Sequence, residues 1–158
     1  MRKLLILGRG QYSYVAEEIA KETFDKIDFL DDNARDAVGK ISEYCNLVND
    51  YEYAIVAIGN PTVRLNLTEH LEKAGYKIAT LISQRAYVSS SATVEKGCIV
   101  EPMAVINPNT VIERCCIISA GVVVNHNSMV GEGCHIDCNA TVVSNSTVSS
   151  KTKIIQKS

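Results

Sequence analysis

The second half of the chain has a hydrophobic pattern with a period of six residues. A Val or an Ile occurs at every sixth position from Val88 to Ile154 without interruption. A strand would show a period of two and a helix a period of 3.6, so the pattern indicates an internal repeat. We predict a parallel β-solenoid, in which each repeat adds one short strand whose aliphatic side chain points into a narrow core. The residues two positions before the aliphatic ones are mostly small and let the chain turn a corner.

The first half alternates between strand and helix patterns. Apolar runs predict strands at 3–8, 26–32, 53–60 and 77–82, and helical spacing predicts helices at 13–24 and 62–75. This alternation is typical of a small parallel α/β sheet, which binds its ligands at the carboxyl ends of the strands. The predicted fold class is therefore α/β plus all-β, with a Rossmann-like domain over residues 1–82 and a β-helix over residues 83–158.

Composition narrows the class of protein further. The chain has 158 residues, 46% of them hydrophobic, and a net charge of −2 with both signs mixed. We expect no nucleic-acid partner and no membrane insertion, because the chain lacks a basic patch and an apolar run of about 20 residues. The start, MRKLLILGRG, has no small-residue cleavage site and is interpreted as a first strand rather than a signal peptide. We expect a cytoplasmic protein whose six cysteines are reduced.

Four motifs in this order resemble one family. They are LLILGRGQYSYVAEEIA, FLDDN, VAIGN followed by Arg64, and NHNSMVGEGCHI. Together with the repeat, they are similar to the bacterial sugar O/N-acyltransferases, which include sialic acid O-acetyltransferases and UDP-4-amino-sugar N-acetyltransferases of glycan biosynthesis. The resemblance implies a left-handed β-helix with 18 residues per coil and a homotrimer with active sites between neighbouring subunits. It also implies acetyl transfer from acetyl-CoA to an amine or hydroxyl of a UDP-sugar, without a metal.

An 18-residue coil also accounts for three of the cysteines. Cys98, Cys116 and Cys134 are 18 residues apart, so they are expected to stack at one corner in successive coils. A metal site at this corner is an alternative. We favour small buried thiols, because the equivalent positions in other repeats carry Ala, Ser or Thr and no C-x-x-C spacing is present.

Residues of the first domain are candidates for binding a nucleotide. Gly8 and Gly10 follow a strand and precede a helix, so their backbone N–H groups can face a phosphate; a tight turn without a ligand is the alternative. Ser13 stands where the third glycine of a dinucleotide fingerprint would be, which argues against NAD and an oxidoreductase. Asp31 and Asp32 end the second strand and could bind uracil or ribose, or form a solvated turn.

Three more residues belong to this candidate site. Asn60 and Arg64 suit the diphosphate, although Arg64 could equally be a surface charge on a helix. Tyr12 stands in the glycine loop at a position where the family usually has a histidine.

His126 is the candidate general base. The reaction needs a group that accepts a proton near neutral pH, and histidine does so without a perturbed pKa. The resemblance places the base two residues after a core aliphatic, here Val124, and places His135 near the bound thioester. The alternatives are a solvent-facing corner histidine for His126 and a packed side chain for His135.

The chain departs from the family at several of these positions. Asn125 replaces the acid that usually precedes the base, Ser119 replaces an asparagine, and Ser144 replaces a glycine that lets coenzyme A approach. Family members also continue for about two coils beyond Ile154. These departures leave a second hypothesis open, which is a non-catalytic nucleotide-sugar-binding or scaffold trimer with a degenerate coenzyme A site.

Overall fold

The computed structural model describes residues 1–156 and divides the chain into two compact units, Met1–Ala79 and Thr80–Ser158. The division falls three residues before the predicted boundary. The expectation of one strand over residues 77–82 is wrong, because the segment forms two short strands with different partners. β4 (Lys77–Ile78) pairs with β3 (Tyr53–Val56) of the α/β sheet, whereas β5 (Leu81–Ile82) pairs with β8 (Ile99–Val100) of the solenoid.

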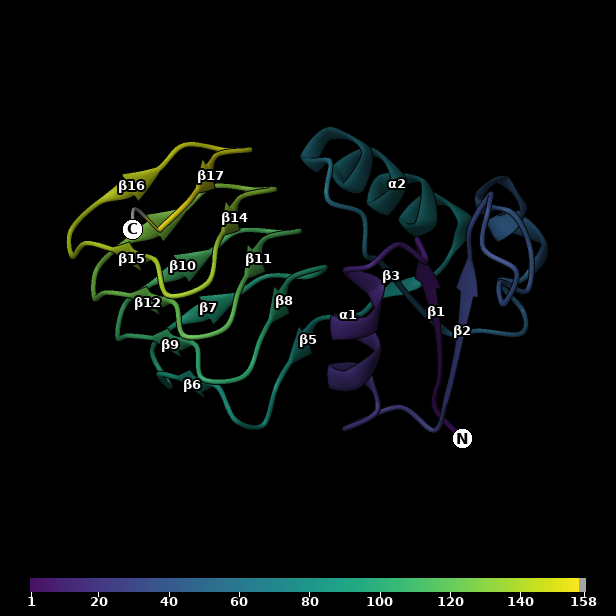
Figure 1. The fold of residues 1–158 in the computed structure, drawn as a ribbon, viewed down its shortest axis with the longest axis horizontal. Helices are drawn as coiled ribbons and strands as arrows, with labels where there is room; N and C mark the ends of the chain where they lie inside the picture. The colour runs from purple at the N-terminus through teal and green to yellow at the C-terminus, as the bar shows by residue number, and fades with distance from the viewer. Residues whose placement is uncertain (157–158) are drawn as a thin grey trace. The chain divides into compact units, whose positions relative to one another are not determined.

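The first unit is built around a four-stranded parallel sheet (Figure 1). Its remaining elements are β1 (Lys3–Leu7), α1 (Ser13–Ala20), β2 (Lys26–Leu30), the 3-10 helix η1 (Ile41–Asn46) and α2 (Pro61–Ala74). The strand order is β2-β1-β3-β4. The strands predicted at 3–8, 26–32 and 53–60 and both predicted helices are thus present, although shorter in part, whereas η1 was not expected.

The central strand and the second helix follow directly from their sequences. β1 is apolar at four consecutive positions because both faces of the sheet are covered, and Leu5 and Leu7 share a core cluster with Leu71 of α2. α2 begins where the Asn60 side chain caps the backbone N–H of Val63, and it ends at Gly75, whose φ of 104° is left-handed. Asparagine at the N-cap and glycine after the last turn are favoured for these reasons.

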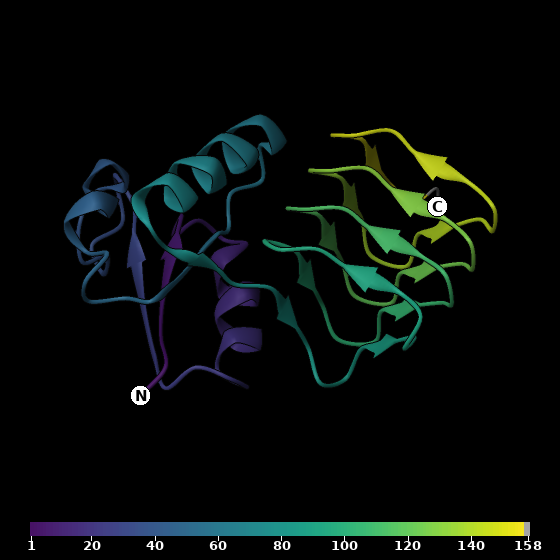
Figure 2. The same cartoon turned by 180° about the vertical axis from the view of Figure 1, so that it is seen from behind.

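The second unit is a parallel β-helix of two-residue strands. Each strand ends on the aliphatic residue of the six-residue repeat, and strands 18 residues apart are hydrogen-bonded neighbours. The strands form three ladders (Figures 1 and 2), in the orders β17-β14-β11-β8-β5, β15-β12-β9-β6 and β16-β13-β10-β7. The remaining bounds are β6 (Tyr87–Val88), β7 (Thr93–Val94), β9 (Val105–Ile106), β10 (Val111–Ile112), β11 (Ile117–Ile118), β12 (Val123–Val124), β13 (Met129–Val130), β14 (His135–Ile136), β15 (Thr141–Val142), β16 (Thr147–Val148) and β17 (Lys153–Ile154).

The core of the β-helix matches the prediction from the repeat. The aliphatic positions from Val100 to Ile136 are fully buried and form one cluster with the small residues. Cys98, Cys116 and Cys134 belong to this cluster, and each thiol lies 3.0–3.1 Å from a backbone carbonyl oxygen 15 residues further on. Thr110 and Ser128 use their hydroxyl groups in the same way. The small polar side chains therefore satisfy carbonyl groups inside the narrow coil.

The corners of the β-helix depend on left-handed backbone. Ten residues with positive φ follow their core aliphatic by three positions, which are Gly97, Met103, Asn109, Cys115, Gly121, Asn127, Gly133, Asn139, Asn145 and Lys151. This conformation turns the backbone N–H toward the preceding coil. For example, Asn127 N–H donates to Pro108 O at 3.0 Å, and Asn145 N–H donates to His126 O at 3.1 Å. Glycine and asparagine dominate because other side chains are strained there.

No helix among residues 1–156 has the length and apolar character needed to cross a membrane.

Strain at Met103 can be removed by substitution. Met103 is exposed and has a φ of 66°, so Met103→Asn is expected to stabilise the protein by about 0.5–1 kcal/mol. Urea unfolding would measure this change. Met129→Asn is the matched control, because Met129 is also exposed but lies in an extended strand. A gain in stability that is equal in both variants would contradict the explanation.

The thiols should fall into two reactivity classes. Cys45 and Cys138 are exposed, whereas the other four are buried. Contact with the Cys116 thiol, together with burial, raises the pKa of Cys134 far above its ordinary value, which suppresses the reactive thiolate. Titration with a disulfide reagent is expected to modify two thiols in the native protein and all six after denaturation. Rapid modification of more than two native thiols would refute this assignment.

Candidate functional site

The candidate nucleotide site is formed by loops at the carboxyl edge of the first sheet. Gly8, Gly10 and Tyr12 follow β1, Asp31 and Asp32 follow β2, and Asn60 follows β3. The strand order β2-β1-β3 makes these three loops neighbours. From β1 the chain passes to β2 on one side of β1, and it then crosses to β3 on the other side. The carboxyl ends of β1 and β3 therefore flank a topological switch point, where ligands of such sheets bind.

The glycines of these loops differ in whether the fold requires glycine at their positions. Gly8 needs to be glycine for the fold, because its φ is 102° and a Cβ would lie 2.7 Å from the Ile58 side chain. Gly10 and Gly59 have no positive φ, and a Cβ on either would meet no atom within 4 Å. Neither packing nor backbone conformation therefore requires glycine at these two positions. A bare backbone on both sides of the switch point leaves its N–H groups accessible to a phosphate.

Asp31 organises the loop in which it lies. Its Oδ2 accepts the backbone N–H of Arg9 at 2.7 Å, and its Oδ1 accepts those of Asn33 and Ala34 at 2.8 and 2.9 Å. These bonds, with that from Arg9 first, hold the pKa of the Asp31 carboxyl below its ordinary value. Asp32 is exposed, and its Oδ1 accepts the backbone N–H of Ile41 at 3.1 Å.

Arg64 is not a surface charge. Only 1% of the residue is exposed, and its guanidinium donates to the carbonyl oxygens of Ile58 and Gly59 at 2.8 and 3.0 Å. This burial rules out the alternative of a surface charge on a helix, and the role of Arg64 at the diphosphate stays a prediction. The two hydrogen bonds of its guanidinium hold the loop between β3 and α2, which keeps Gly59 and Asn60 at the edge of the sheet.

Arg9 is a second arginine whose side chain is held in place, and the sequence patterns did not single it out. Its guanidinium lies over the rings of Tyr14 and Phe29, at 4.3 and 3.8 Å from their centroids, and it forms ion pairs with Glu17 and Asp36. Burial lowers its pKa, but the hydrogen bonds to the two carboxylates outweigh burial and hold the pKa above its ordinary value. Arg9 thereby joins the loop after β1 to the loop after β2.

The bonds to Asp31 predict a pH-dependent stability. A carboxyl whose pKa is depressed by folding contributes stability above its unfolded pKa of about 4, and this contribution is lost as the pH falls through the folded pKa. Asp31→Asn is expected to cost roughly 1–3 kcal/mol at pH 7, because an NH₂ group would then face one of the three backbone donors. The cost should shrink at pH 3. Urea unfolding at both pH values would measure it.

Asp32→Asn is the matched control for this prediction. Asp32 accepts one backbone N–H, and the amide oxygen of asparagine can replace the carboxylate oxygen there. A cost for Asp31→Asn that equals the cost for Asp32→Asn, or that is the same at both pH values, would show that the three bonds are not responsible.

His126 lies at an exposed corner of the β-helix, between β12 and β13. Its backbone is fixed on both sides, because its carbonyl accepts the N–H of Asn145 and its own N–H donates to Asn125 Oδ1 at 3.0 Å. Its ring Nδ1 lies 3.1 Å from the side-chain nitrogen of Asn127. The ring therefore has one nitrogen held by a protein group and leaves Nε2 for a ligand.

Asn125, which stands where the resemblance places an acid before the base, forms its side-chain hydrogen bonds away from the His126 ring. Its Oδ1 accepts the backbone N–H of His126 and lies 3.3 Å from the side-chain nitrogen of Asn107. The residue that contacts the ring is Asn127, which the sequence had not suggested for this role. A signal was present, since Asn109, Asn127 and Asn145 are spaced by one coil and all have positive φ.

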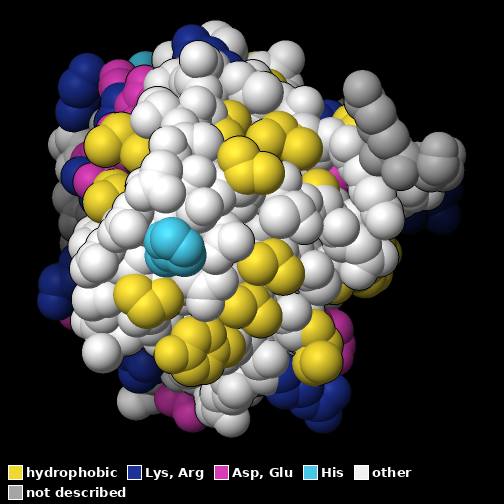
Figure 3. Space-filling model, turned by 90° about the vertical axis from the view of Figure 1, so that its left-hand side faces the viewer, with side chains coloured by type: hydrophobic (Ala, Val, Ile, Leu, Met, Phe, Trp, Pro, Cys, Tyr) yellow, Lys and Arg dark blue, Asp and Glu magenta, His cyan; other side chains and the backbone are white. Residues whose placement is uncertain are grey.

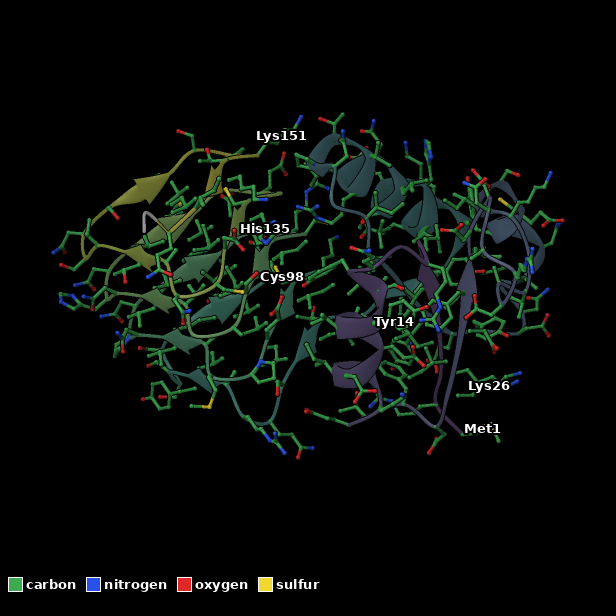
Figure 4. The ribbon with its side chains drawn as sticks, viewed as in Figure 1. Met1, Tyr14, Lys26, Cys98, His135 and Lys151 are labelled. Carbon is green, nitrogen blue, oxygen red and sulfur yellow. The ribbon has the colours of Figure 1, made fainter. Side chains whose placement is uncertain are left out.

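His135 lies on a different part of the coil from His126. It is the first residue of β14, in the ladder that also contains β8, next to which Cys98 is found (Figure 4). Its Nε2 lies 3.0 Å from the Ser119 hydroxyl and 4.0 Å from Asp137 Oδ1. Nine residues, half of one coil, separate the two histidines, and no hydrogen bond joins them.

Ser144 is the equivalent of His126 in the next coil. It follows His126 by 18 residues, so strand spacing places the two backbones about 4.8 Å apart. Ser144, which was grouped with His135 in the expected coenzyme A site, therefore lies beside His126. Its neighbour Val143 is 66% exposed. Figure 3 views the β-helix from the side of β6, β9, β12 and β15, and separate hydrophobic patches surround one exposed histidine there.

Within residues 1–156, no group of three or more His, Cys, Asp or Glu side chains is placed to hold a metal ion.

Comparisons with known proteins find similar sequences and structures. The family model described as the PglD N-terminal domain matches residues 3–71. The acetyltransferase domain of PglB from Neisseria gonorrhoeae FA1090, solved in complex with acetyl coenzyme A, is 26% identical, with a TM-score of 0.88 over 96% of this chain and 87% of that one. PerB from Caulobacter crescentus, solved with CoA and GDP-perosamine, is 19% identical, with a TM-score of 0.77 over 99% and 90%. WeeI from Acinetobacter baumannii AYE is 14% identical, with a TM-score of 0.63 over 99% and 97%.

The fold and these likenesses define the class of protein. The chain is a small α/β unit followed by a left-handed β-helix, which confirms the predicted fold class. The match over the first unit and the likeness to the acetyltransferase domain of PglB over nearly the whole chain support the resemblance to the bacterial sugar acetyltransferases that have a hexapeptide-repeat β-helix.

Proposed function

We propose that the protein transfers an acetyl group from acetyl-CoA to an amine or hydroxyl of a nucleotide-linked sugar, with His126 as the general base. The observation that carries this proposal is the placement of His126, an exposed histidine on a rigid corner whose ring is held at Nδ1 and accessible at Nε2. The likeness to the acetyltransferase domain of PglB in complex with acetyl coenzyme A supports the choice of acetyl donor.

The reaction needs one proton acceptor and no covalent enzyme intermediate. His126 Nε2 takes the proton from the sugar amine or hydroxyl while the nitrogen or oxygen forms its bond to the acetyl carbonyl carbon. The bond from that carbon to sulfur then breaks, and the coenzyme A thiolate leaves and takes up a proton. Holding both substrates beside one fixed base lowers much of the barrier through orientation.

The acetyl donor is expected to lie along the coil that contains Ser144. This residue is half-buried one coil from His126, and the exposed Val143 next to it offers an apolar contact. His135, the first residue of β14, is bonded to Ser119 and lies half a coil from His126 in a different ladder, so we place it outside the immediate surroundings of His126 within one subunit. A role for His135 in binding coenzyme A therefore requires a site completed by a neighbouring subunit.

A homotrimer would supply such a site. Exposed large hydrophobic side chains of the β-helix, which include Tyr87, Met129 and Val143, are available for contact with a second copy of the chain. A closed ring of copies buries the same two surfaces in every subunit, which makes the assembly self-limiting.

The first unit is expected to bind the nucleotide of the sugar substrate, which accepts the acetyl group. Gly10 and Gly59 leave bare backbone on the two sides of the topological switch point, and Asn60 begins α2 there. Arg64 supports this loop from within, because it is buried and its Nη1 donates to two carbonyl oxygens of the loop, so we expect it to act on the diphosphate through the loop that it holds. We retain UDP as the first nucleotide to test, with GDP as the second because PerB was solved with GDP-perosamine.

Substitution of His126 tests the proposed function. His126→Ala is expected to lower kcat roughly 10²–10⁴-fold, which is the usual contribution of a general base. Binding of acetyl-CoA and of the nucleotide sugar should be retained, because His126 contributes to the chemical step. Turnover would be measured by thiol release with UDP- and GDP-linked amino sugars, and binding would be measured by calorimetry.

His70→Ala is the control, since His70 lies on α2 of the first unit and stacks on Tyr44. Its turnover should equal that of the wild type. Unchanged turnover in His126→Ala would eliminate His126 as the base. A folded wild-type protein that binds no acetyl-CoA would instead favour the non-catalytic scaffold.

A further inference from the structure

We propose that Tyr14 is the platform on which the nucleobase of the nucleotide-linked sugar stacks, with the Arg9 guanidinium supporting the inner face of its ring. This inference rests on the proposed nucleotide binding by the first unit and adds a contact for the base. The glycines of the loops account for the diphosphate only, because a bare backbone offers hydrogen bonds and no surface for stacking.

Tyr14 is not part of the packing of α1. The buried residues of this helix are Ser13, Ala16, Ile19 and Ala20. They lie on one side of the helix, and Tyr14 lies off that side and is 56% exposed. The hydrophobic core therefore does not require an aromatic residue at position 14, and its ring is available for a ligand.

The inner face of the Tyr14 ring rests on a stack that begins in the core. Phe29 of β2 is 5% exposed, and the guanidinium carbon of Arg9 lies 3.8 Å from the centroid of its ring. The same carbon lies 4.3 Å from the centroid of the Tyr14 ring. A cation is attracted to the face of an aromatic ring, so Arg9 occupies one face of Tyr14 and leaves the opposite face to the solvent.

The support for the ring is fixed before a ligand arrives. Arg9 Nη1 donates to Glu17 Oε2 at 2.7 Å, and Arg9 Nε donates to Asp36 Oδ2 at 2.9 Å. The Arg9 side chain is only 9% exposed. A base that stacks on Tyr14 does not have to order this support, which lowers the entropic cost of binding.

The platform lies next to the loops of the candidate nucleotide site. Tyr14 is in the first turn of α1 (Figure 4), four residues after Gly10. The backbone N–H of Arg9 donates to Asp31, which joins the support to the loop after β2. A nucleotide whose diphosphate lies at Gly10 can therefore extend its base toward the β2 side of the site, over Tyr14.

Stacking on a tyrosine accepts any nucleobase. Every base has a π face, so the platform contributes affinity without selecting a base by hydrogen bonds. We therefore expect Tyr14 to contribute to the binding of UDP and of GDP alike. Selection between the two nucleotides has to come from contacts with the edge of the base.

Two substitutions at position 14 test the platform. Tyr14→Leu removes the aromatic face but keeps an apolar side chain, and it is expected to weaken binding of UDP and of GDP about 5- to 100-fold in calorimetry. Tyr14→Phe keeps the ring and should bind both nucleotides as the wild type does. Binding of inorganic pyrophosphate, which has no base, should be the same in all three proteins.

Tyr53→Leu is the matched control. Tyr53 begins β3 at the opposite edge of the same sheet, and its ring also contacts an arginine, since the guanidinium carbon of Arg2 lies 5.1 Å from its centroid. This variant loses the same kind of contact between a cation and a ring, far from the loops. Its affinity for UDP and GDP should equal that of the wild type.

Proton NMR of UDP gives a readout of stacking that does not depend on turnover. The ring current of Tyr14 should shift the H5 and H6 resonances of the bound uracil to higher field. Tyr14→Leu should abolish this shift at saturating protein, and Tyr53→Leu should retain it.

The outcomes separate this inference from the proposed function. Wild-type affinity for both nucleotides in Tyr14→Leu, or an equal loss of affinity for pyrophosphate, would overturn the platform. A wild-type protein that binds neither nucleotide would overturn it as well, even if acetyl-CoA binds. Nucleotide binding that depends on Tyr14 in a protein without turnover would instead remove the proposed acetyl transfer and leave the platform in place.

Discussion

The parallel hydrogen-bond ladders between coils are the constraint on which the second unit depends. Strands pair only when the chain returns to the same height every 18 residues, and this requires three short strands and three corners per coil. The corners close because one residue in each turn adopts positive φ and directs its N–H toward the coil before it. The same requirement places a histidine, its neighbours and Ser144 at fixed heights along one edge.

Much of this unit could be predicted from sequence, because a solenoid repeats its physics in every coil. The period of six located the strands, and the spacing of 18 stacked Cys98, Cys116 and Cys134. Ile82 was not recognised as a repeat position, because residues 77–82 were assigned to a strand of the α/β unit. Its pairing with Val100 nevertheless continues the same ladder. The contact of Asn127 was missed because it depends on backbone direction at a left-handed corner, which hydrophobic spacing does not reveal.

The strands and helices of the first unit could be predicted from the sequence, but the contacts of its charged side chains could not. Sequence patterns locate the ends of strands, and so they identified the loops that carry Gly10, Asp31 and Asn60. They treat arginine as a surface residue, whereas Arg64 is buried against two carbonyl oxygens and Arg9 lies between two rings and two carboxylates. Both side chains fasten loops at the edge of the sheet, which only the three-dimensional arrangement can show.

The two units therefore hold their loops and corners in place with different interactions. In the α/β unit, charged side chains hold the loops in place, and the groups left accessible are backbone N–H groups beside Gly10 and Gly59. In the β-helix, backbone ladders provide the rigidity, so the corner around His126 needs no charge to keep its shape. The proposed base, His126, is contacted by neutral amides and so gains little electrostatic help in accepting a proton, and the proposed reaction must rely on orientation.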